Sequence, residues 1–261
     1  MEKFPQNQTP FKDDLVKSNI SQHQHGEFER LYEFKNNPNK IIRLMNLNDL
    51  GYEHHDHIDP IELVALGKKL YNELEEKYNI HAPVEYVVGN DMDGERVVYG
   101  ITDRITSNLE NNKQLAEQAE KLYTSLSKYY SDKSEGLSNG GMFLTDIRGF
   151  SQYVYGTKAG DEQPKFYLVD TDLYMHDDKL SFYYVIAWLI RHMSSVEKKF
   201  GKHFDVARKN IETILSNPIL EGLAENEKET IQKTIVEANN FLRGEFSEES
   251  ENLPSGNFRM D

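Results

Sequence analysis

The order of the predicted elements limits the folds that this chain can adopt, because a hairpin, a helix and a second hairpin precede a mostly helical half. In the second hairpin, the β-rich runs VEYVVG and RVVYGIT flank NDMDGE, where Asp93 and Gly94 supply the positive φ of a tight turn. The first hairpin joins EFERLYEF to KIIRLMN through the turn-forming NNPN. The sequence therefore predicts an α+β fold with a small antiparallel sheet in its N-terminal part.

A helix is predicted between the two hairpins, where Asp59 is a suitable N-cap and Pro60 suits the first helical position. One apolar stripe with three- and four-residue spacing must pack on the rest of the protein. It consists of Leu63, Leu66, Leu70 and Leu74. Asn79 is predicted to end this helix. A second helix is predicted from Asn112 to about Tyr130, before the breaker-rich segment SDKSEGLSNGG.

Two short strands and three helices are predicted in the remainder of the chain. The strands are GFSQYVYG and KFYLVD, of which the second is apolar enough to be buried. LSFYYVIAWLIRHM is apolar nearly all round, so we expect it to be a central helix. DVARKNIETILS and EKETIQKTIVEANNFLRG are amphipathic and are predicted to cover that helix.

The charge balance argues against nucleic acid and anionic lipid as partners. The 261 residues include 30 Lys and Arg against 44 Asp and Glu, a formal net charge of −14, and the basic residues are scattered. Cysteine is absent, which excludes disulfides and thiolate metal sites. No apolar run approaches the roughly 20 residues that cross a bilayer. We therefore expect a cytoplasmic protein that binds neither nucleic acid nor membrane.

The element order resembles that of the protein-kinase-like fold. The resemblance implies a small antiparallel-sheet N-lobe at residues 21–105 and a mostly helical C-lobe at residues 106–244, with ATP and Mg²⁺ between them. Residues 1–20, which are polar and contain two prolines, are predicted to be a flexible arm. Residues 245–261, which are acidic and Ser-rich, are predicted to be a disordered tail.

Several N-lobe motifs of the family have degenerate counterparts here. GEFERLY, which begins at Gly26, is similar to the end of the glycine-rich loop, but Glu29 stands where the family usually has another glycine. KIIR is similar to the strand that carries the family's lysine, which places Arg43 in that role. The helix glutamate that would hold it is Glu62 or Glu73. Alternatively, both are solvated residues at the edge of the leucine stripe.

The hinge and the catalytic loop also have counterparts. ITDRITSNL is similar to the hinge, where the backbone around Asp103, from Thr102 to Arg104, would contact adenine. TDIRGFSQYVYG occupies the position of the catalytic loop. The resemblance makes Asp146 the catalytic base and puts Ser151 or Gln152 where the metal-binding asparagine belongs.

An acidic pair in LVDTD follows the second short strand and is similar to the family's magnesium-binding segment. Asp170 is the implied metal ligand and Asp172 its alternative, because carboxylate oxygens suit Mg²⁺. The competing interpretation is that the pair caps a turn or the next helix. Nucleotide binding requires that Arg43 and Asp170 face each other in the folded protein.

Two functions are consistent with these motifs. The first is nucleotide binding with Mg²⁺ between the lobes, with phosphotransfer to an unknown acceptor left open. The second is a catalytically inactive, pseudokinase-like scaffold that binds another protein. A helical assembly protein unrelated to kinases is a third possibility, and it would lack a five-stranded N-terminal sheet.

A histidine-rich segment offers a separate candidate metal site. Imidazoles and a carboxylate can bind Zn²⁺ or Ni²⁺. The residues concerned are His23, His25, His54, His55, Asp56 and His57. Histidines in a loop, without the spacing of a helix face, are more often solvated side chains.

Overall fold

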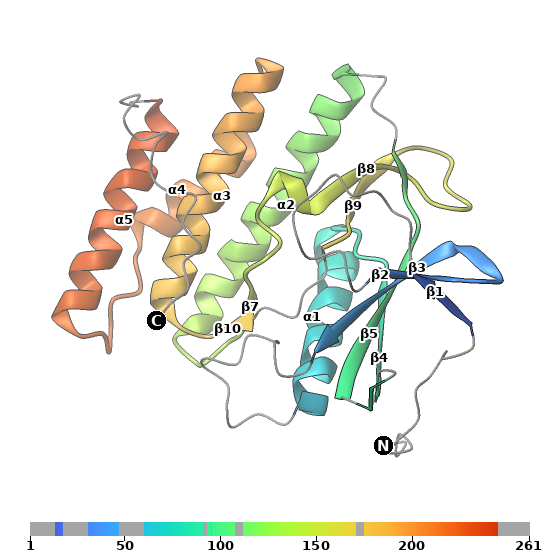
Figure 1. Ribbon diagram of the computed structural model, residues 1–261. Helices are drawn as coiled ribbons and strands as arrows, with labels where there is room; N and C mark the ends of the chain where they lie inside the picture. Colours follow the sequence, from blue (N-terminus) through green and yellow to red (C-terminus); the bar gives the residue numbers. More distant parts are fainter. Residues whose placement is uncertain are drawn as a thin grey trace.

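A five-stranded antiparallel sheet with the order β1-β2-β3-β5-β4 forms the N-terminal part of the computed structural model (Figure 1). The structure describes residues 14–17, 31–46, 60–90, 93–94, 96–107, 112–170 and 175–244. The strands are β1 (Leu15–Lys17), β2 (Leu31–Phe34), β3 (Asn37–Asn46), β4 (Val84–Asn90) and β5 (Arg96–Asp103). This sheet confirms the predicted α+β class and rules out an all-helical protein.

Both predicted hairpins are confirmed. β2 pairs with β3, and β4 pairs with β5. Gly94, in the turn of the second hairpin, has a φ of 88°, which is the conformation that favours glycine.

Strand β1 differs from the prediction that residues 1–20 form a flexible arm. It pairs with β2 at the edge of the sheet, and Leu15 is buried beside Ile42 and Tyr99. An extended segment with one leucine can bury that side chain and satisfy its backbone on an existing strand, which composition alone does not reveal. Residues 1–13 and 245–261 lie outside the described residues.

Helix α1 (Pro60–Tyr78) lies beside the sheet and connects β3 to β4 (Figure 1). It begins and ends where the sequence predicts, and Asn79 follows it with a left-handed φ of 55°. Leu70 and Leu74 are buried in a core that includes Tyr86 of β4. Leu66, Leu70 and Leu74 of the predicted stripe therefore pack between the sheet and the helices.

The two faces of the sheet bury different clusters. Successive residues of a strand point to opposite faces. Ile42 is fully buried on the face away from α1, together with Tyr99 and Leu15. Met45 belongs to the main core with α1 and the other helices. Arg43 is two residues before Met45 in β3, so both side chains lie on the same face of the sheet. Arg43 therefore points toward the helices.

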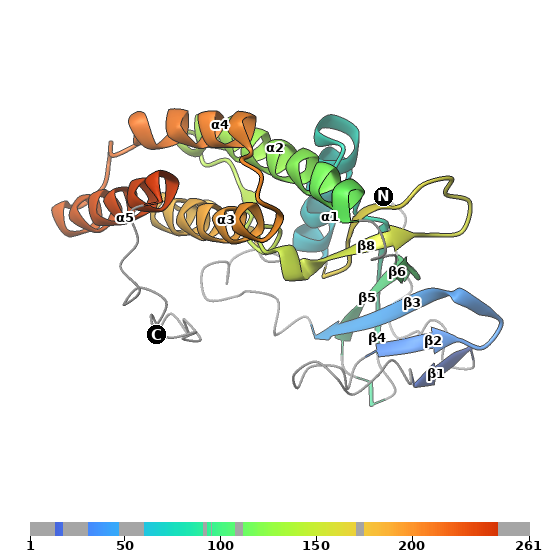
Figure 2. The same ribbon diagram turned by 90° about the horizontal axis from the view of Figure 1, so that it is seen from above.

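Four further α-helices of the described residues contribute to the main core, together with the short strands. They are α2 (Asn112–Leu137), α3 (Lys179–Phe200), α4 (Asp205–Ser216) and α5 (Glu225–Arg243). Helix α3 contacts α2 and α5, and α4 also contacts both of these helices (Figure 2). Ten of the 22 residues of α3 are buried, and the helix packs against both α2 and α5, which confirms its prediction as a central helix.

Helix α2 is longer than predicted, because it continues through Ser131 to Leu137. Side chains from this last part bind α1. The Lys77 Nζ lies 2.9 Å from the Asp132 carboxylate, and the Lys133 Nζ lies 2.6 Å from the Glu73 carboxylate. The last part of α2 is rich in Gly and Ser and has a low intrinsic helix propensity. Its contacts with α1 help to keep it helical.

Short strands connect the sheet to the helices. β6 (Thr106–Ser107), β8 (Tyr153–Thr157) and β9 (Lys165–Leu168) form a three-stranded sheet, and β7 (Phe143–Leu144) pairs with β10 (Met175–His176). The predicted strand GFSQYVYG is only partly a strand, since Phe150–Gln152 is a 3₁₀ helix. β8 and β9 lie between the helices and the five-stranded sheet (Figure 1 and Figure 2).

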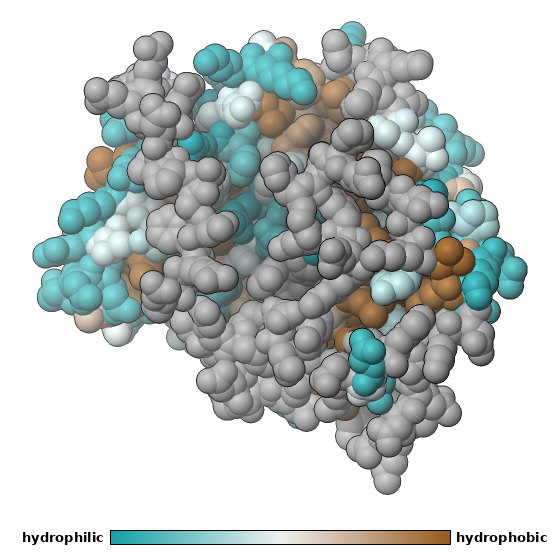
Figure 3. All heavy atoms as spheres, viewed as in Figure 1, coloured by the Kyte–Doolittle hydropathy of each residue, from teal (hydrophilic) through white to brown (hydrophobic). Residues whose placement is uncertain are grey.

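The described surface over α5 is mostly hydrophilic (left in Figure 3). This agrees with the amphipathic pattern of that helix, whose buried residues include Ile231 and Ala238. In the part of the chain that the structure describes, no helix is both long and apolar enough to cross a bilayer.

The N-cap of α3 provides a pH-dependent contribution to stability. Asp178 accepts a hydrogen bond from the Ser181 N–H at 2.7 Å. Burial alone would raise the pKa of Asp178, but hydrogen bonds from His176 and Ser181 outweigh it and lower this pKa from 3.8 to about 2. We expect Asp178→Ala to lower the free energy of unfolding by about 1 kcal/mol near neutral pH.

This difference between wild type and Asp178→Ala should disappear in acid. Because the folded-state pKa is depressed, the stabilisation is complete above the unfolded-state pKa and is lost as pH falls from about 4 through about 2. Urea unfolding of both proteins across this range measures the difference. If the difference in the free energy of unfolding stays constant down to about pH 2, the charged Asp178 carboxylate is not the source of the stabilisation.

Candidate functional site

An ion pair joins the sheet to the helical part. The Arg43 guanidinium of β3 binds the carboxylate of Asp170, which follows β9. Both groups are partly exposed, with 26% of the Arg43 side chain and 38% of the Asp170 side chain accessible. The two residues that the nucleotide hypothesis requires to face each other are therefore in direct contact.

Asp146 and Gln152 belong to the same cluster of side chains. The Gln152 side-chain amide donates to the Asp146 carboxylate, and its oxygen accepts the Gly149 N–H at 2.8 Å. The Gln152 backbone oxygen accepts the Val169 N–H at 3.0 Å, next to Asp170. Gln152 thus connects the loop that carries Asp146 to the segment that carries Asp170.

The Asp146 carboxyl has an unusual electrostatic environment. Burial raises its pKa, and the negative charge of Asp170 raises it further. Arg148, whose Nη1 lies 3.8 Å from the carboxylate, opposes this shift, as do the hydrogen bond from Gln152 and the charge of Arg43. A buried carboxyl with a raised pKa, beside a second carboxylate, favours binding of a proton or another cation.

Two tyrosines of α2 position the start of the Asp146 loop. The Leu144 N–H donates to the Tyr129 hydroxyl at 2.9 Å, and the Tyr130 hydroxyl donates to the Leu144 carbonyl oxygen at 3.0 Å. Both tyrosines are fully buried. Sequence reasoning missed this role, and the only signal was an adjacent pair of aromatic residues with polar tips near the end of a helix.

Neither predicted helix glutamate contacts Arg43 within the part of the chain that the structure describes. Glu73 binds Lys133 of α2 instead, and Glu62 is exposed in the first turn of α1. Glu73 lies on the side of α1 that faces α2, where Lys133 is its partner. The predicted pairing of an α1 glutamate with Arg43 is therefore not formed.

The predicted hinge lies largely within the sheet. Thr102 is paired with β3 on one side and β4 on the other, and the Arg104 N–H donates to the Asn39 carbonyl oxygen. The Asp103 carboxylate lies 2.6 Å from the Lys40 Nζ and 3.4 Å from the Lys158 Nζ. The predicted adenine contact at this position would thus compete with hydrogen bonds of the sheet.

Some predicted residues lie outside the described part of the chain. They are Gly26, Asp172 and the histidine-rich set of His23, His25, His54, His55, Asp56 and His57. Among the residues that the structure describes, no group of three or more His, Asp or Glu side chains is arranged to hold a metal ion. Asp170 and Asp146 form an acidic pair, not a complete set of ligands.

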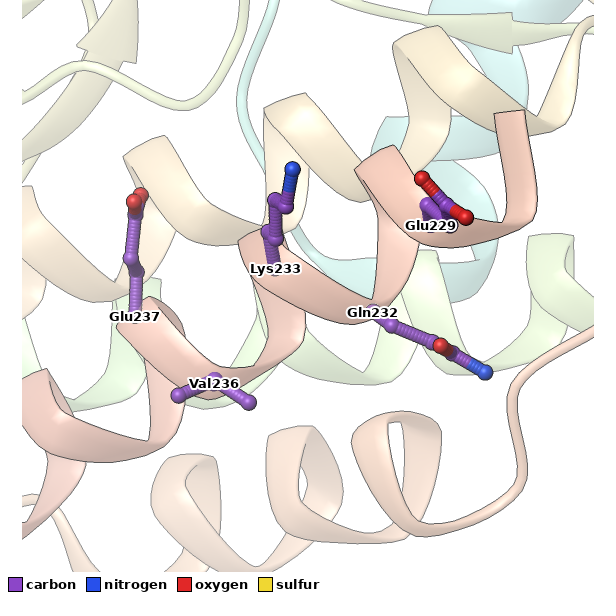
Figure 4. Close-up of a pocket in the computed structure, with 5 residues that line it drawn as sticks. All are labelled: Glu229, Gln232, Lys233, Val236 and Glu237. Atoms are coloured by element: carbon purple, nitrogen blue, oxygen red, sulfur yellow. The ribbon is translucent and has the colours of Figure 1, made fainter. Parts of the chain in front are cut away.

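A shallow hollow of about 380 Å³ lies on α5, separate from these residues. It is lined by Glu229, Gln232, Lys233, Val236 and Glu237. Figure 4 shows Glu229, Lys233 and Glu237 on one side of the helix and Val236 and Gln232 on the other. All of the lining residues of this hollow belong to α5, and none of them belongs to the site at Asp146.

Replacement of Asp146 by asparagine should raise the stability of the protein at neutral pH. Because its folded-state pKa is raised, the charged carboxylate destabilises the protein as pH rises through that pKa. Asp146→Asn removes this charge and should raise Tm at neutral pH by roughly 2–4 °C, equivalent to about 1 kcal/mol. Calorimetry at neutral and acidic pH checks this, since the gain should vanish where Asp146 is protonated. A lower Tm at neutral pH would show that its hydrogen bonds outweigh its charge.

Comparison with protein-family models finds no match for the chain, and comparison with curated proteins also finds none. Arg43, Asp146, Gln152 and Asp170 come from three separate segments and meet in one cluster, which is the candidate site.

Proposed function

We propose that this chain is a cytoplasmic protein with a bilobal, kinase-like fold that binds ATP with Mg²⁺ between its sheet and its helical part. The observation that carries the proposal is the ion pair of Arg43 with Asp170, beside Asp146. The order of the five strands, with α1 inserted between β3 and β4, supports the same fold. Transfer of phosphate to an acceptor would extend this binding function.

The chemistry of the cluster fits a magnesium nucleotide. A guanidinium such as that of Arg43 holds phosphate through its planar set of N–H donors. The carboxylate oxygens of Asp170 and Asp146 suit Mg²⁺, which takes further oxygens from phosphates and water. The raised pKa of Asp146, caused by burial and by Asp170, indicates a place where a divalent cation would relieve the repulsion. Gln152 fits a positioning role, because its amide holds Asp146.

One observation favours the alternative of a catalytically inactive scaffold. Glu73 binds Lys133, so no described α1 glutamate holds Arg43. In kinases that pair must be formed for phosphoryl transfer. A scaffold that binds another protein without using the nucleotide is therefore the second candidate function.

A thermal-shift titration with Mg·ATP separates the two functions. At about 100 times its Kd, a ligand specific for the folded state adds about 2.7 kcal/mol of stability. This corresponds to a rise in Tm of roughly 5–10 °C for a chain of this size. We expect this rise with Mg·ATP and a smaller one with ATP in the presence of a chelator.

Variants on strand β3 locate the binding site. Arg43→Ala should abolish most of the shift, whereas Lys40→Ala, on the same strand, should keep it. Lys40 pairs with Asp103 and is a matched cationic control outside the Asp146 cluster. Absence of any shift in the wild type would leave only the scaffold function. An equal shift in Arg43→Ala would place the nucleotide elsewhere.

A further inference from the structure

A group of cationic and aromatic side chains extends from Arg148, whose Nη1 lies 3.8 Å from Asp146. Arg148, from the Asp146 loop, has its Cζ 6.0 Å from the centre of the Trp188 ring, and the Arg191 Cζ lies 5.5 Å from the same ring. His192 stacks on Trp188 with ring centres 5.6 Å apart and an interplanar angle of 29°. We call Arg148, Trp188, Arg191 and His192 the Trp188 cluster.

Helix α3 presents the other three members of this cluster along one partly exposed stripe. Trp188, Arg191 and His192 are spaced by three and four residues, so they lie on one side of the helix. All of them are partly accessible, while Leu189, Ile190 and Met193 on the other side are buried. The cluster is therefore a surface feature, not part of the core.

Helix α3 is basic around Trp188, in contrast to the acidic chain as a whole. The chain has a net charge of −14, yet α3 contains no Asp or Glu before Glu197. Among the described residues, Arg191 has no carboxylate partner, and Arg148 has only Asp146 at 3.8 Å. Burial lowers the pKa of His192, and the positive charges of Arg148 and Arg191 lower it further. Both guanidiniums are therefore close enough to interact electrostatically with the imidazole.

Such an arrangement is suited to an anion. A guanidinium that stacks on an aromatic ring keeps its N–H donors at the edge of its plane, where carboxylate or phosphate oxygens can accept them in pairs. A neutral imidazole adds one more donor. Two arginines without full compensation by carboxylates raise the local concentration of anions.

We propose that the Trp188 cluster is an anion-binding subsite that receives the carboxylate or phosphate group of a second ligand, whose remaining part reaches Asp146. Anion binding by the cluster stands on its own, while the role of that ligand as partner of a nucleotide rests on the proposed function. Arg148 links the two places, because it contacts both Asp146 and Trp188.

Tryptophan fluorescence tests this subsite directly, because Trp188 is the only tryptophan of the chain. Inorganic phosphate and acetate are titrated separately, without nucleotide, and sodium chloride keeps the ionic strength constant. We expect a saturable change in emission with at least one of them. The stronger response identifies the preferred group as phosphate or carboxylate. No change with either anion, or the same change with chloride alone, overturns the proposal.

Variants identify the residues responsible. Arg191→Ala should weaken the apparent affinity about tenfold or more, as expected for loss of a charged hydrogen-bonding group. Arg191→Lys should weaken it less, because charge is kept and the planar fork is lost. Arg243→Ala, at the exposed end of α5, should respond like the wild type. An Arg191→Ala protein with wild-type Tm and unchanged affinity contradicts the subsite.

The same variants separate this inference from the proposed function. Arg191→Ala should lose the anion response and keep the Mg·ATP shift in Tm. Arg43→Ala should lose the Mg·ATP shift and keep the anion response. Failure of only one response therefore rejects only the corresponding site.

Discussion

Glu197→Ala is expected to lower the free energy of unfolding by about 3–5 kcal/mol, the usual cost of removing one partner from a buried ion pair. Glu197, at 3% exposure, accepts from the Arg208 Nε at 2.8 Å and from the Phe204 N–H at 2.6 Å. Arg208 also donates to the Leu242 carbonyl oxygen. Loss of the carboxylate leaves a partly buried guanidinium without its ion-pair partner where α3, α4 and α5 meet.

The measurement is the Tm together with urea unfolding, and Tm should fall by roughly 10 °C or more. Glu225→Ala is the matched control, since Glu225 pairs with Lys228 at 2.7 Å but its side chain is 84% exposed. Exposed pairs contribute little, so this control should change the free energy of unfolding by less than about 0.5 kcal/mol. Similar losses in both variants would contradict the importance of burial.

Replacing both α2 tyrosines, Tyr129→Phe with Tyr130→Phe, should lower the free energy of unfolding by about 2–6 kcal/mol. The double variant removes a hydroxyl acceptor from the Leu144 N–H and a hydroxyl donor from its carbonyl oxygen. Each buried backbone group that loses its partner costs about 1–3 kcal/mol. Because Leu144 precedes the Asp146 loop, the loop should also become less ordered, and the Mg·ATP shift should weaken.

Denaturant unfolding measures the loss, and hydrogen exchange across residues 143–152 reports on the loop. Tyr123→Phe is the control of the same kind, because the Tyr123 hydroxyl is buried and, within the described residues, has no hydrogen-bond partner. Removing it should be neutral or slightly stabilising. If the double variant behaves like Tyr123→Phe, the tyrosines fill space and do not hold the loop.

The sequence predicts that Arg43 and Asp170 face each other, and the structure brings them into contact. Arg43 and Asp170 are 127 residues apart, yet they pair, and Asp146 and Gln152 lie beside them. Their roles in binding nucleotide and metal stay predictions. The resemblance of element order to a known fold was the only basis for expecting these segments to meet, since spacing within one segment contains no information about another.

Other site residues could not be predicted because their partners depend on exact helix rotation. Glu62 and Glu73 both flank the leucine stripe, and only the packing of α1 against α2 directs Glu73 to Lys133. The Trp188 cluster could not be predicted from the sequence for a similar reason. An apolar stretch such as FYYVIAWLIRHM predicts a core helix, and only its packing leaves one stripe next to Arg148.

Local chemistry in the sequence was sufficient for both hairpins, for the limits of α1 and for the central position of α3. Turn residues such as Gly94 and the spacing of apolar side chains act over a few residues, so the sequence alone determines them. Tertiary structure decided the pairing of β1, the extension of α2 to Leu137 and the meeting of Arg43 with Asp170. These features depend on burial and charge contacts between distant segments, which exist only when the whole chain is folded.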